Sequence, residues 1–158
     1  MNNKIPIVIT QERPDSADAF QLIDELQKQL NPEMYPDASR HGYSVDKLLR
    51  EGVTFFVTRH DEIPAVCGGI KLFGTEYAEV KRMYVRPQYR GLGLGKLMLD
   101  HLAGYAQERQ VNILRLETGI YQTEAIKLYE RFGFERRGPF GEYKVDALSI
   151  YFEKRITE

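Results

Sequence analysis

The stretch RPQYRGLGLGK, residues 86–96, decides the fold of this chain. It lies between a run of strand-forming residues and an amphipathic helical pattern, a context in which backbone N–H groups can bind an anion. Glycines permit tight conformations and let phosphate oxygens approach the backbone. The start of a helix adds unpaired N–H donors and a partial positive charge, and Arg90 and Lys96 add cationic donors. The stretch therefore predicts a phosphate-binding loop.

Three kinds of phosphate loop compete for this stretch. A P-loop needs glycine five residues before its Gly-Lys pair and a hydroxyl residue after it, but Arg90 precedes Gly95 by five and Leu97 follows Lys96. The dinucleotide fingerprint needs a third glycine three residues after Gly93, where Lys96 stands, and it follows the first strand of its unit. The pattern that remains is Arg-x-x-Gly-x-Gly. A plain flexible turn is the structural alternative, and the position between a strand and a helix disfavours it.

Upstream of the loop, four runs rich in β-branched and aromatic residues predict strands: 5–10, 53–58, 65–73 and 78–85. Short turns separate the last three, which is typical of an antiparallel meander. Asp15 or Ser16 can cap a helix, and Ser44 can cap a shorter one that ends at Gly52. The expected apolar face of the first helix comprises Phe20, Ile23, Leu26 and Leu30.

Downstream of the loop, helical spacing predicts a helix that runs to about Arg109. Its expected apolar stripe comprises Leu94, Leu97, Met98, Leu102 and Tyr105. A strand is expected at 111–117, a helix at 124–132, and closing strands at 135–137 and 149–154. This order predicts one α/β domain over residues 1–158, with a mixed, mostly antiparallel sheet of about seven strands flanked by about four helices.

The composition excludes several classes of protein. Of the 158 residues, 42% are hydrophobic and 28% charged, which is typical of a globular domain and not of a disordered or fibrous chain. The net charge of −1 supplies no field that would attract nucleic acid or anionic lipid. Cys67, the single cysteine, excludes an internal disulfide and a Cys-rich zinc site, and its apolar neighbours predict a buried strand position. We expect no metal, no membrane segment and a cytoplasmic location.

Four segments, taken in order, resemble the GNAT family of N-acetyltransferases. EVKRMYV (79–85) is similar to the family's fourth strand, and residues 86–96 to its pyrophosphate loop. LRLETG (114–119) is similar to its fifth strand, and QTEAIKLYERFGF (122–134) to the helix and turn that follow. Together these segments span residues 79–134, about a third of the chain.

The resemblance implies a GNAT-like fold in which acetyl-CoA binds where the strands at 78–85 and 111–117 splay apart. The backbone of Met83 and Val85, with Tyr84 between them, would pair with the pantetheine arm like an added strand. The acetyl group would pass to a primary amine by direct attack in a ternary complex.

The resemblance also assigns further cofactor contacts. Gln122 stands where many family members carry Asn and would contact the cofactor arm, as would Tyr129. The loop residues that would hold the pyrophosphate are Arg90, Gly91, Leu92, Gly93, Leu94, Gly95 and Lys96.

Acetyl transfer to an amine needs a base, a polarised thioester carbonyl and a stabilised leaving thiolate. The resemblance gives Tyr129 the position of the proton donor to sulfur, and Glu79 a general-base position that some members use. Strand alternation predicts that Glu79 and Met83 share one face. The structural alternatives are a packing role for Tyr129 and a surface ion pair of Glu79 with Lys81 or Arg82.

Four other candidates are less specific. His41 belongs to an irregular segment that can wall an acceptor pocket, whereas His101 is expected as a packed or surface residue of a helix. Glu117 is a lesser candidate for contacting a cationic acceptor. The aromatic residues within 139–143 can line the pocket or cover the sheet edge.

The acceptor itself stays open at this stage. A near-neutral charge favours a small-molecule amine over a protein N-terminus or lysine. A non-catalytic acyl-CoA sensor and a nucleotide-binding protein are the alternatives from other classes, and the missing hydroxyl after Lys96 disfavours the latter. The oligomeric state also stays open, and the family resemblance implies a homodimer through the C-terminal strands. Acyl groups longer than acetyl are equally compatible with the sequence.

Overall fold

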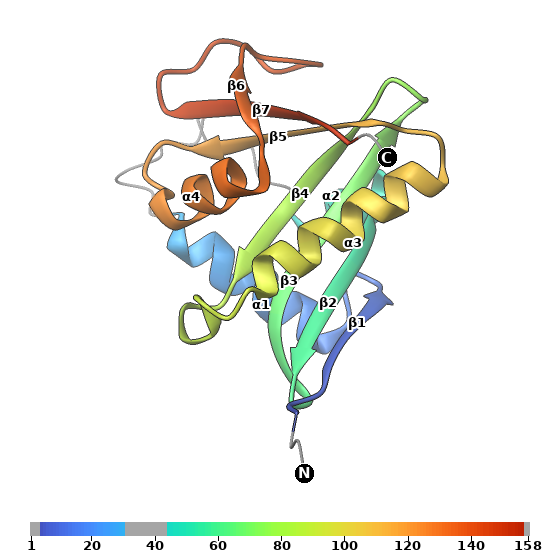
Figure 1. Cartoon of the computed structure of the whole chain (residues 1–158), viewed down its shortest axis with the longest axis vertical. Coiled ribbons are helices and arrows are strands. Elements are labelled where there is room, and N and C mark those ends of the chain that lie inside the picture. The colour runs from blue at the N-terminus through green and yellow to red at the C-terminus, as the bar shows by residue number, and fades with distance from the viewer. Residues whose placement is uncertain (1–3, 31–43, 157–158) are drawn as a thin grey trace.

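The computed structural model describes residues 4–30 and 44–156, which form a twisted sheet with helices on both faces (Figure 1). The strands are β1 (Ile7–Glu12), β2 (Thr54–His60), β3 (Ile63–Phe73), β4 (Tyr77–Val85), β5 (Ile113–Gly119), β6 (Glu135–Arg137) and β7 (Ser149–Arg155). The helices are α1 (Ala17–Gln29), α2 (Val45–Arg50), α3 (Leu94–Glu108) and α4 (Thr123–Phe132), with a 3-10 turn at Pro87–Tyr89. The predicted order of elements is confirmed, and their bounds differ by up to two residues.

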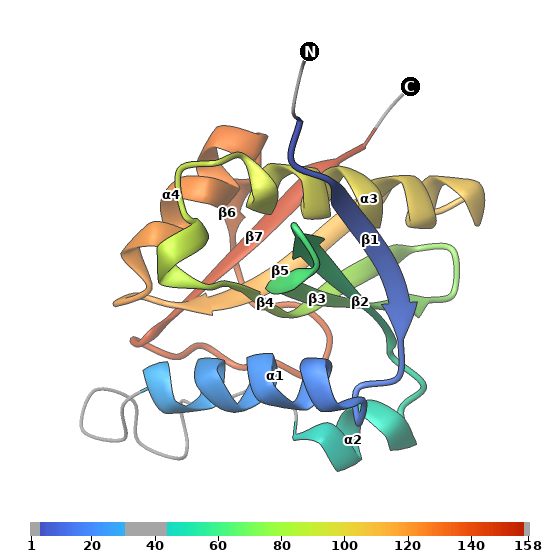
Figure 2. The same ribbon diagram turned by 90° about the horizontal axis from the view of Figure 1, so that it is seen from below.

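The seven strands lie in the order β1-β2-β3-β4-β5-β7-β6. Every neighbouring pair is antiparallel except β4 and β5, which are parallel. Helices α1 and α2 cover one face of the sheet, and α3 and α4 cover the other (Figure 2). The α/β prediction with a mixed, mostly antiparallel sheet is confirmed.

Serine residues begin both N-terminal helices, as predicted. The Ser16 hydroxyl accepts a hydrogen bond from the Ala19 N–H at 3.2 Å, and the Ser44 hydroxyl accepts one from the Lys47 N–H at 3.1 Å. Such caps satisfy backbone donors that have no partner inside the helix. No helix within residues 4–30 and 44–156 is both long enough and apolar enough to cross a membrane.

Two predicted core residues are exposed. The side chain of Phe20 is 54% exposed and that of Leu97 is 39% exposed. The residues that the two helices bury recur every three or four positions, and Phe20 and Leu97 lie outside these stripes. Helix α1 buries Ala19, Leu22, Ile23 and Leu26, and α3 buries Leu94, Gly95, Met98, Leu99, Leu102, Ala103 and Ala106.

The parallel strands β4 and β5 separate soon after they meet. Only two registered pairs join them, Ala78 with Leu114 and Glu79 with Arg115. The rest of β5 remains paired with β7 on its other side, and the two strands diverge toward α4 (Figure 1). The predicted splay between these strands is confirmed.

A β-bulge interrupts β4 beside this opening. The β3–β4 register shifts between Cys67 and Gly69, and Arg82 has a φ of 52°. An inserted residue reverses the facing of the side chains that follow it. Before the bulge, Val80 packs toward α3 and Glu79 faces α1. After it, Met83 packs toward α3 and Tyr84 toward α1. The prediction that Glu79 and Met83 share a face is therefore wrong.

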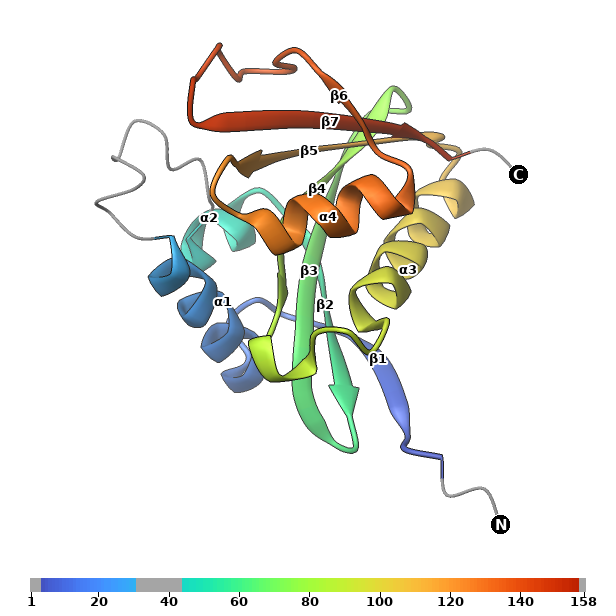
Figure 3. The ribbon, with the colours of Figure 1, turned by 60° about the vertical axis from the view of Figure 1, so that its left-hand side comes forward.

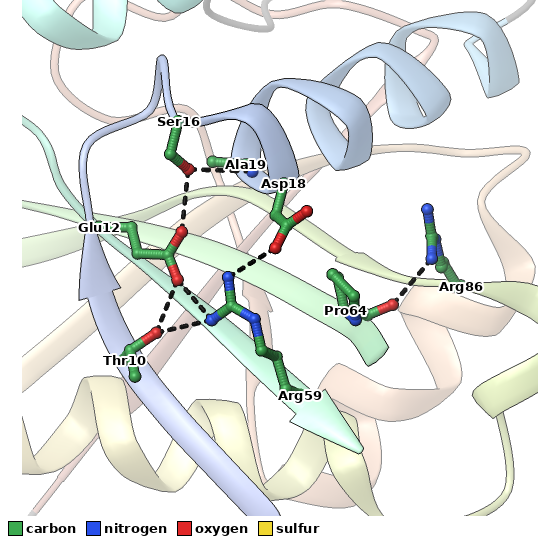
Figure 4. A network of polar contacts seen from close by, with 8 residues as sticks. All are labelled: Thr10, Glu12, Ser16, Asp18, Ala19, Arg59, Pro64 and Arg86. Atoms are coloured by element: carbon green, nitrogen blue, oxygen red, sulfur yellow. Dashed lines mark hydrogen bonds and ion pairs between the residues drawn. The ribbon is translucent and has the colours of Figure 1, made fainter. Parts of the chain in front are cut away.

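An ion-pair network joins the first strand and helix to the sheet (Figure 4). Arg59 of β2 donates hydrogen bonds to Glu12 and Thr10 of β1, and its second nitrogen donates to Asp18 of α1 at 2.8 Å. The Ser16 hydroxyl donates to the other oxygen of Glu12 at 2.9 Å. One guanidinium therefore connects β1, β2 and the start of α1.

Candidate active site

A cleft of about 730 Å³ occupies the opening between β4 and β5. It starts at the loop after β4, runs along α4, and ends at side chains on the α1 face of the sheet. Figure 3 shows α4 and α3 on the same side of the sheet. The predicted residues that line it are Glu79, Met83, Tyr84, Val85, Arg90, Gly91, Gly93, Leu94, Gly95, Lys96, Gln122 and Tyr129. Leu92, also predicted, is 55% exposed and is not among the described lining residues.

The loop presents backbone donors to the mouth of the cleft. Gly91 and Gly93 have φ values of 80° and 78°, in the left-handed region that favours glycine. The first hydrogen bond of α3 runs from the Leu97 N–H to the Gly93 carbonyl, so the three preceding N–H groups have no acceptor inside the helix. With the exposed cations Arg90 and Lys96 beside them, these donors suit a diphosphate.

Gly95 differs from Gly91 and Gly93 because close packing leaves no room for a side chain there. A Cβ atom there would lie 2.8 Å from Leu128 Cδ2 and 3.2 Å from Val85 Cγ2. The absent side chain therefore lets the start of α3 pack directly against α4 and β4. The sequence pattern predicts only an anion-binding role for this glycine, so its packing role is an addition from the structure.

Tyr129 packs in the core and lines the cleft at the same time. It is 4% exposed, and its ring lies 5.7 Å from that of Phe134 and 6.0 Å from that of Phe152, between centroids. Burial raises the pKa of its phenol, and the nearby Glu117 carboxylate raises it further. The hydroxyl therefore keeps its proton at neutral pH and can donate it, or a hydrogen bond, into the cleft.

A buried polar cluster of Glu79, Lys81 and Tyr143 lies at the α1 end of the cleft. The side chains of Glu79 and Lys81 are 3% and 6% exposed, and the ammonium lies 2.8 Å from Glu79 Oε2. The Tyr143 hydroxyl donates to the same Oε2 at 2.6 Å, and the ammonium donates to the Tyr143 oxygen at 3.3 Å. The ion pair expected at the surface is thus buried inside the cleft.

Burial disfavours the charged form of Lys81 in this cluster. It lowers the pKa of the Lys81 ammonium, because a charged group loses hydration, while the carboxylate of Glu79 opposes that change. The cation and the anion therefore stabilise each other in a place where either one alone would be costly.

Tyr143 reaches the cleft because aromatic contacts hold the segment between β6 and β7. Its ring lies 5.1 Å from that of Phe140 and 5.5 Å from that of Tyr151, and Phe140 packs edge-on against Tyr77 at 5.6 Å. Both interpretations of residues 139–143 therefore hold, since Phe140 covers the sheet and Tyr143 lines the cleft.

Sequence reasoning did not single out Lys81 as a member of the site, and it named Tyr143 only among the aromatic residues that can line the pocket, with no contact to Glu79. A signal for Lys81 was available, because residues two apart on a strand share a face, and Glu79 was already a candidate. No local pattern predicts the contact between Tyr143 and Glu79, because the two residues lie 64 positions apart.

The lesser candidates divide between the cleft and the core. Glu117 lines the cleft and accepts a hydrogen bond from the Ser149 hydroxyl at 2.8 Å. His101 packs edge-on against Phe56 with ring centroids 4.5 Å apart, as expected for a packed residue. Cys67 is fully buried, which confirms the strand position. His41 lies outside the described residues.

One side of the cleft is bridged by glutamine side chains. Gln29, at the end of α1, donates to the Gln122 side-chain oxygen at 2.7 Å and accepts from Arg90 at 3.4 Å. These contacts connect α1 with the start of α4 and with the loop.

The arrangement defines what the site can do. Cationic and N–H donors at the mouth suit a diphosphate, while a buried phenol and a buried carboxylate deeper in the cleft can give and accept protons. The described residues contain no group of three or more His, Cys, Asp and Glu side chains that could hold a metal ion. Fold and cleft together suit an enzyme that binds a diphosphate-bearing cosubstrate at the mouth and transfers protons deeper in the cleft.

Comparisons with known proteins identify the family. The sequence profile of the acetyltransferase (GNAT) family matches residues 20–134. The IAA acetyltransferase of Azospirillum brasilense is 39% identical over 152 residues, which are 95% of this chain and 98% of that protein. The uncharacterized N-acetyltransferase YsnE of Bacillus subtilis is 33% identical over 125 residues, or 78% of this chain and 83% of its own. The chain therefore belongs to the GNAT family of acetyltransferases and is an N-acetyltransferase.

Solved structures agree with this assignment. A crystal structure from Klebsiella pneumoniae is 34% identical and superposes with a TM-score of 0.80, covering 96% of this chain and 98% of that one. The PaiA N-acetyltransferase of Thermoplasma acidophilum, solved in complex with coenzyme A, is 20% identical with a TM-score of 0.75. That comparison covers 95% of this chain and 99% of the other and shows the shared fold.

Proposed function

We propose that this protein transfers the acetyl group of acetyl-CoA to the primary amine of a small molecule. The observation that carries the proposal is the cleft itself, which leads from the glycine-rich loop after β4, between β4 and β5, to a buried carboxylate on the other side of the sheet. Donor and acceptor can therefore enter from opposite faces and meet where the strands separate, as direct transfer in a ternary complex requires.

The residues at the mouth of the cleft fit coenzyme A. The N–H groups at the start of α3, with Arg90 and Lys96, would hold the pyrophosphate. The edge of β4 beyond its pairing with β5 would receive the pantetheine arm at Met83, Tyr84 and Val85, as an added strand. Support comes from fold relatives, since the Thermoplasma acidophilum structure contains coenzyme A and one from Elizabethkingia anophelis contains acetyl-CoA.

Glu79 and Tyr129 would carry the proton transfers. The amine nitrogen attacks the thioester carbon, a C–N bond forms, the C–S bond breaks, and Glu79 accepts the proton that the amine loses. Tyr129 gives a proton or a hydrogen bond to the departing sulfur. A backbone N–H of β4 near Met83 or Tyr84 would polarise the carbonyl.

The acceptor end of the cleft favours a small molecule over a peptide. Tyr143 lies directly on Glu79, and the Gln29–Gln122 hydrogen bond bridges the cleft between α1 and α4. A peptide needs a groove that is open on both sides of the reacting residue. A relative from Azospirillum brasilense carries the name IAA acetyltransferase, which hints at a small-molecule substrate for that protein.

The direct test is acceptor-dependent release of coenzyme A. Purified protein is given acetyl-CoA with a panel of amines, amino acids, polyamines and short peptides, beside Tyr129→Phe and Glu79→Gln. We expect release with a small amine, and losses in kcat on the order of 10²-fold for either variant, because each removes one proton transfer.

Matched variants outside the cleft serve as controls. Tyr105→Phe removes a hydroxyl that contacts Thr54, and Glu130→Gln changes an exposed residue of α4; both are expected to retain wild-type rates. Thermal stabilisation by acetyl-CoA without release by any acceptor would support a sensor instead. Absence of both binding and release would refute the proposal.

A further inference from the structure

Within the described residues, Glu79 is held through one of its two oxygens. The Tyr143 hydroxyl at 2.6 Å and the Lys81 ammonium at 2.8 Å both contact Oε2. Among residues 4–30 and 44–156, none donates a hydrogen bond to Oε1. Oε1 is not enclosed by protein atoms. Because Glu79 lines the cleft, this oxygen faces the cleft.

The other charged groups next to Glu79 have carboxylate partners of their own. Its cross-strand neighbours are Lys71 on β3 and Arg115 on β5. Lys71 is paired with Glu51, and Arg115 with Glu153 at 2.7 Å. Lys81 is the cation whose nitrogen contacts Glu79 itself.

The phenol on Oε2 is held from outside the β4 strand. Ring contacts with Phe140 and Tyr151 pack Tyr143 onto the sheet, and its hydroxyl accepts from Lys81 while donating to Glu79. A triangle of three side chains from two segments therefore restrains the rotation of one carboxylate.

We propose that Tyr143 and Lys81 are positioning residues that hold Glu79 by Oε2 and so direct Oε1 at the acceptor amine. This inference rests on the proposed role of Glu79 as the base. A carboxylate that is fixed in this way is already oriented for proton transfer, and orientation alone accounts for large factors in rate.

The test is a kinetic double-mutant cycle between Glu79→Gln and Tyr143→Phe. It uses the amine that gives the highest rate with the wild-type protein in the panel described above. Tyr143→Phe is expected to lower kcat about tenfold and to leave the KM for acetyl-CoA within about twofold, because its ring packing is retained. In the Glu79→Gln background the same change is expected to alter kcat by less than about twofold, since there is no base left to orient.

Lys81 is tested by the same logic with a second substitution. Lys81→Met leaves the buried carboxylate without its cation, and this variant can lose activity because it fails to fold. Lys81→Arg keeps the charge and therefore distinguishes a loss of positioning from a failure to fold. We expect Lys81→Arg to recover most of the kcat that Lys81→Met loses. Tyr105→Phe and Lys127→Met, two changes outside the cleft, are expected to retain wild-type rates.

The results of the cycle distinguish the proposed base from the proposed positioning role. If Glu79→Gln alone retains full activity, the proposed base is wrong and this inference falls with it. If Glu79→Gln is impaired but Tyr143→Phe is either harmless or equally costly in both backgrounds, the base stands and the positioning role is overturned.

Discussion

Two enclosed side chains show how the position of a residue relative to the cleft decides its chemistry. Tyr129 and Cys67 are 4% and 0% exposed, and burial raises the pKa of both groups. Tyr129 lines the cleft, where a protonated phenol is useful as a donor. The Cys67 thiol instead contacts the Arg82 carbonyl inside the sheet, where it fills space and has no access to substrate.

Cys67 is therefore expected to resist thiol reagents in the folded protein. Burial raises the pKa of its thiol to about 12, and the thiolate is the reactive form. At pH 8 the native protein should react very slowly with a disulfide reagent that absorbs on reaction, and one thiol per chain should react at once in denaturant. Rapid stoichiometric labelling of the native protein would contradict this burial.

A second residue-level prediction concerns Arg86, the residue that starts the loop. Its guanidinium binds both oxygens of Glu25 in α1, at 3.0 and 2.7 Å, and the Pro64 carbonyl at 2.9 Å (Figure 4 shows the last contact). Lysine lacks the planar fork that makes these bonds together. Arg86→Lys should lower the free energy of unfolding by about 1.5–3 kcal/mol, the value of a hydrogen bond to a charged group.

The control for Arg86 is an arginine in an exposed ion pair. Arg13 binds Asp15 at 3.0 Å, with side chains 73% and 43% exposed. Arg13→Lys should leave the unfolding midpoint in urea unchanged within error, because solvent screens such pairs. Equal effects of the two substitutions would show that the Arg86–Glu25 contact does not stabilise the fold.

At the scale of elements, the bulge in β4 explains how one strand serves both sides of the cleft. Without it, strand alternation would put Glu79 and Met83 on one face. The extra residue at Arg82 turns Met83 toward α3 while Glu79 stays on the α1 face. The edge proposed for the cofactor and the proposed base can therefore belong to one strand and still address different faces of the sheet.

Gly95 provides the test of how α3 packs at the cleft. Gly95→Ala would press a methyl group against Leu128 and Val85, and such overpacking typically costs about 1–3 kcal/mol. Gly104 lies in the same helix, and a methyl group there would meet no described atom within 4 Å. Gly104→Ala should instead stabilise the fold by about 0.5–1 kcal/mol.

Urea unfolding of the two alanine variants measures this difference directly. Because Leu128 also lines the cleft, Gly95→Ala should weaken acetyl-CoA binding, whereas Gly104→Ala should not. Stabilisation by both substitutions would mean that Leu128 rotates away without cost.

The accuracy of the sequence predictions follows from the range of the interactions involved. Periodicity and turn residues predicted the strands and α-helices that the structure describes, because those signals are local. The bulge at Arg82 depends on the register with β3, which no window of β4 contains. Phe20 and Leu97 were expected in the core, but they lie outside the stripes that α1 and α3 bury, because the way each helix packs on the sheet decides which stripe is buried.

The residues of the candidate site show the same difference between local and long-range signals. The loop, Glu79 and Tyr129 could be named from motifs, and the structure brings them to one cleft. Tyr143 depends on the aromatic contacts that fold the β6–β7 segment back onto the sheet. Its contact with Glu79 spans 64 residues, so it is a product of tertiary structure.

At the scale of the whole molecule, carboxylates bound to arginines connect the two edges of the sheet to its centre. Glu12 and Arg59 join β1 to β2 (Figure 4), and Glu153 on β7 binds Arg115 of β5 and Arg137 of β6. Burial by itself would raise the pKa of Glu12 and of Glu153. The hydrogen bonds from their arginine partners, with Thr10 and Ser16 at Glu12, outweigh it, so both pKa values are lowered.

These shifts predict that the protein loses stability in acid. An unfolded glutamate has a pKa of about 4.3, so below that value the unfolded chain binds protons that the folded protein does not. The stability from both groups is fully present above that pH and is lost as the pH falls through the folded-state pKa values. The free energy of unfolding, measured in urea between about pH 6 and pH 3, should therefore fall with acid.

Glu12→Gln should be less stable than wild type at pH 6 and should approach it near pH 3, whereas Glu130→Gln, an exposed change on α4, should follow the wild-type curve. A constant offset between Glu12→Gln and wild type across this range would mean that the Arg59 network stabilises the fold through packing and not through charge.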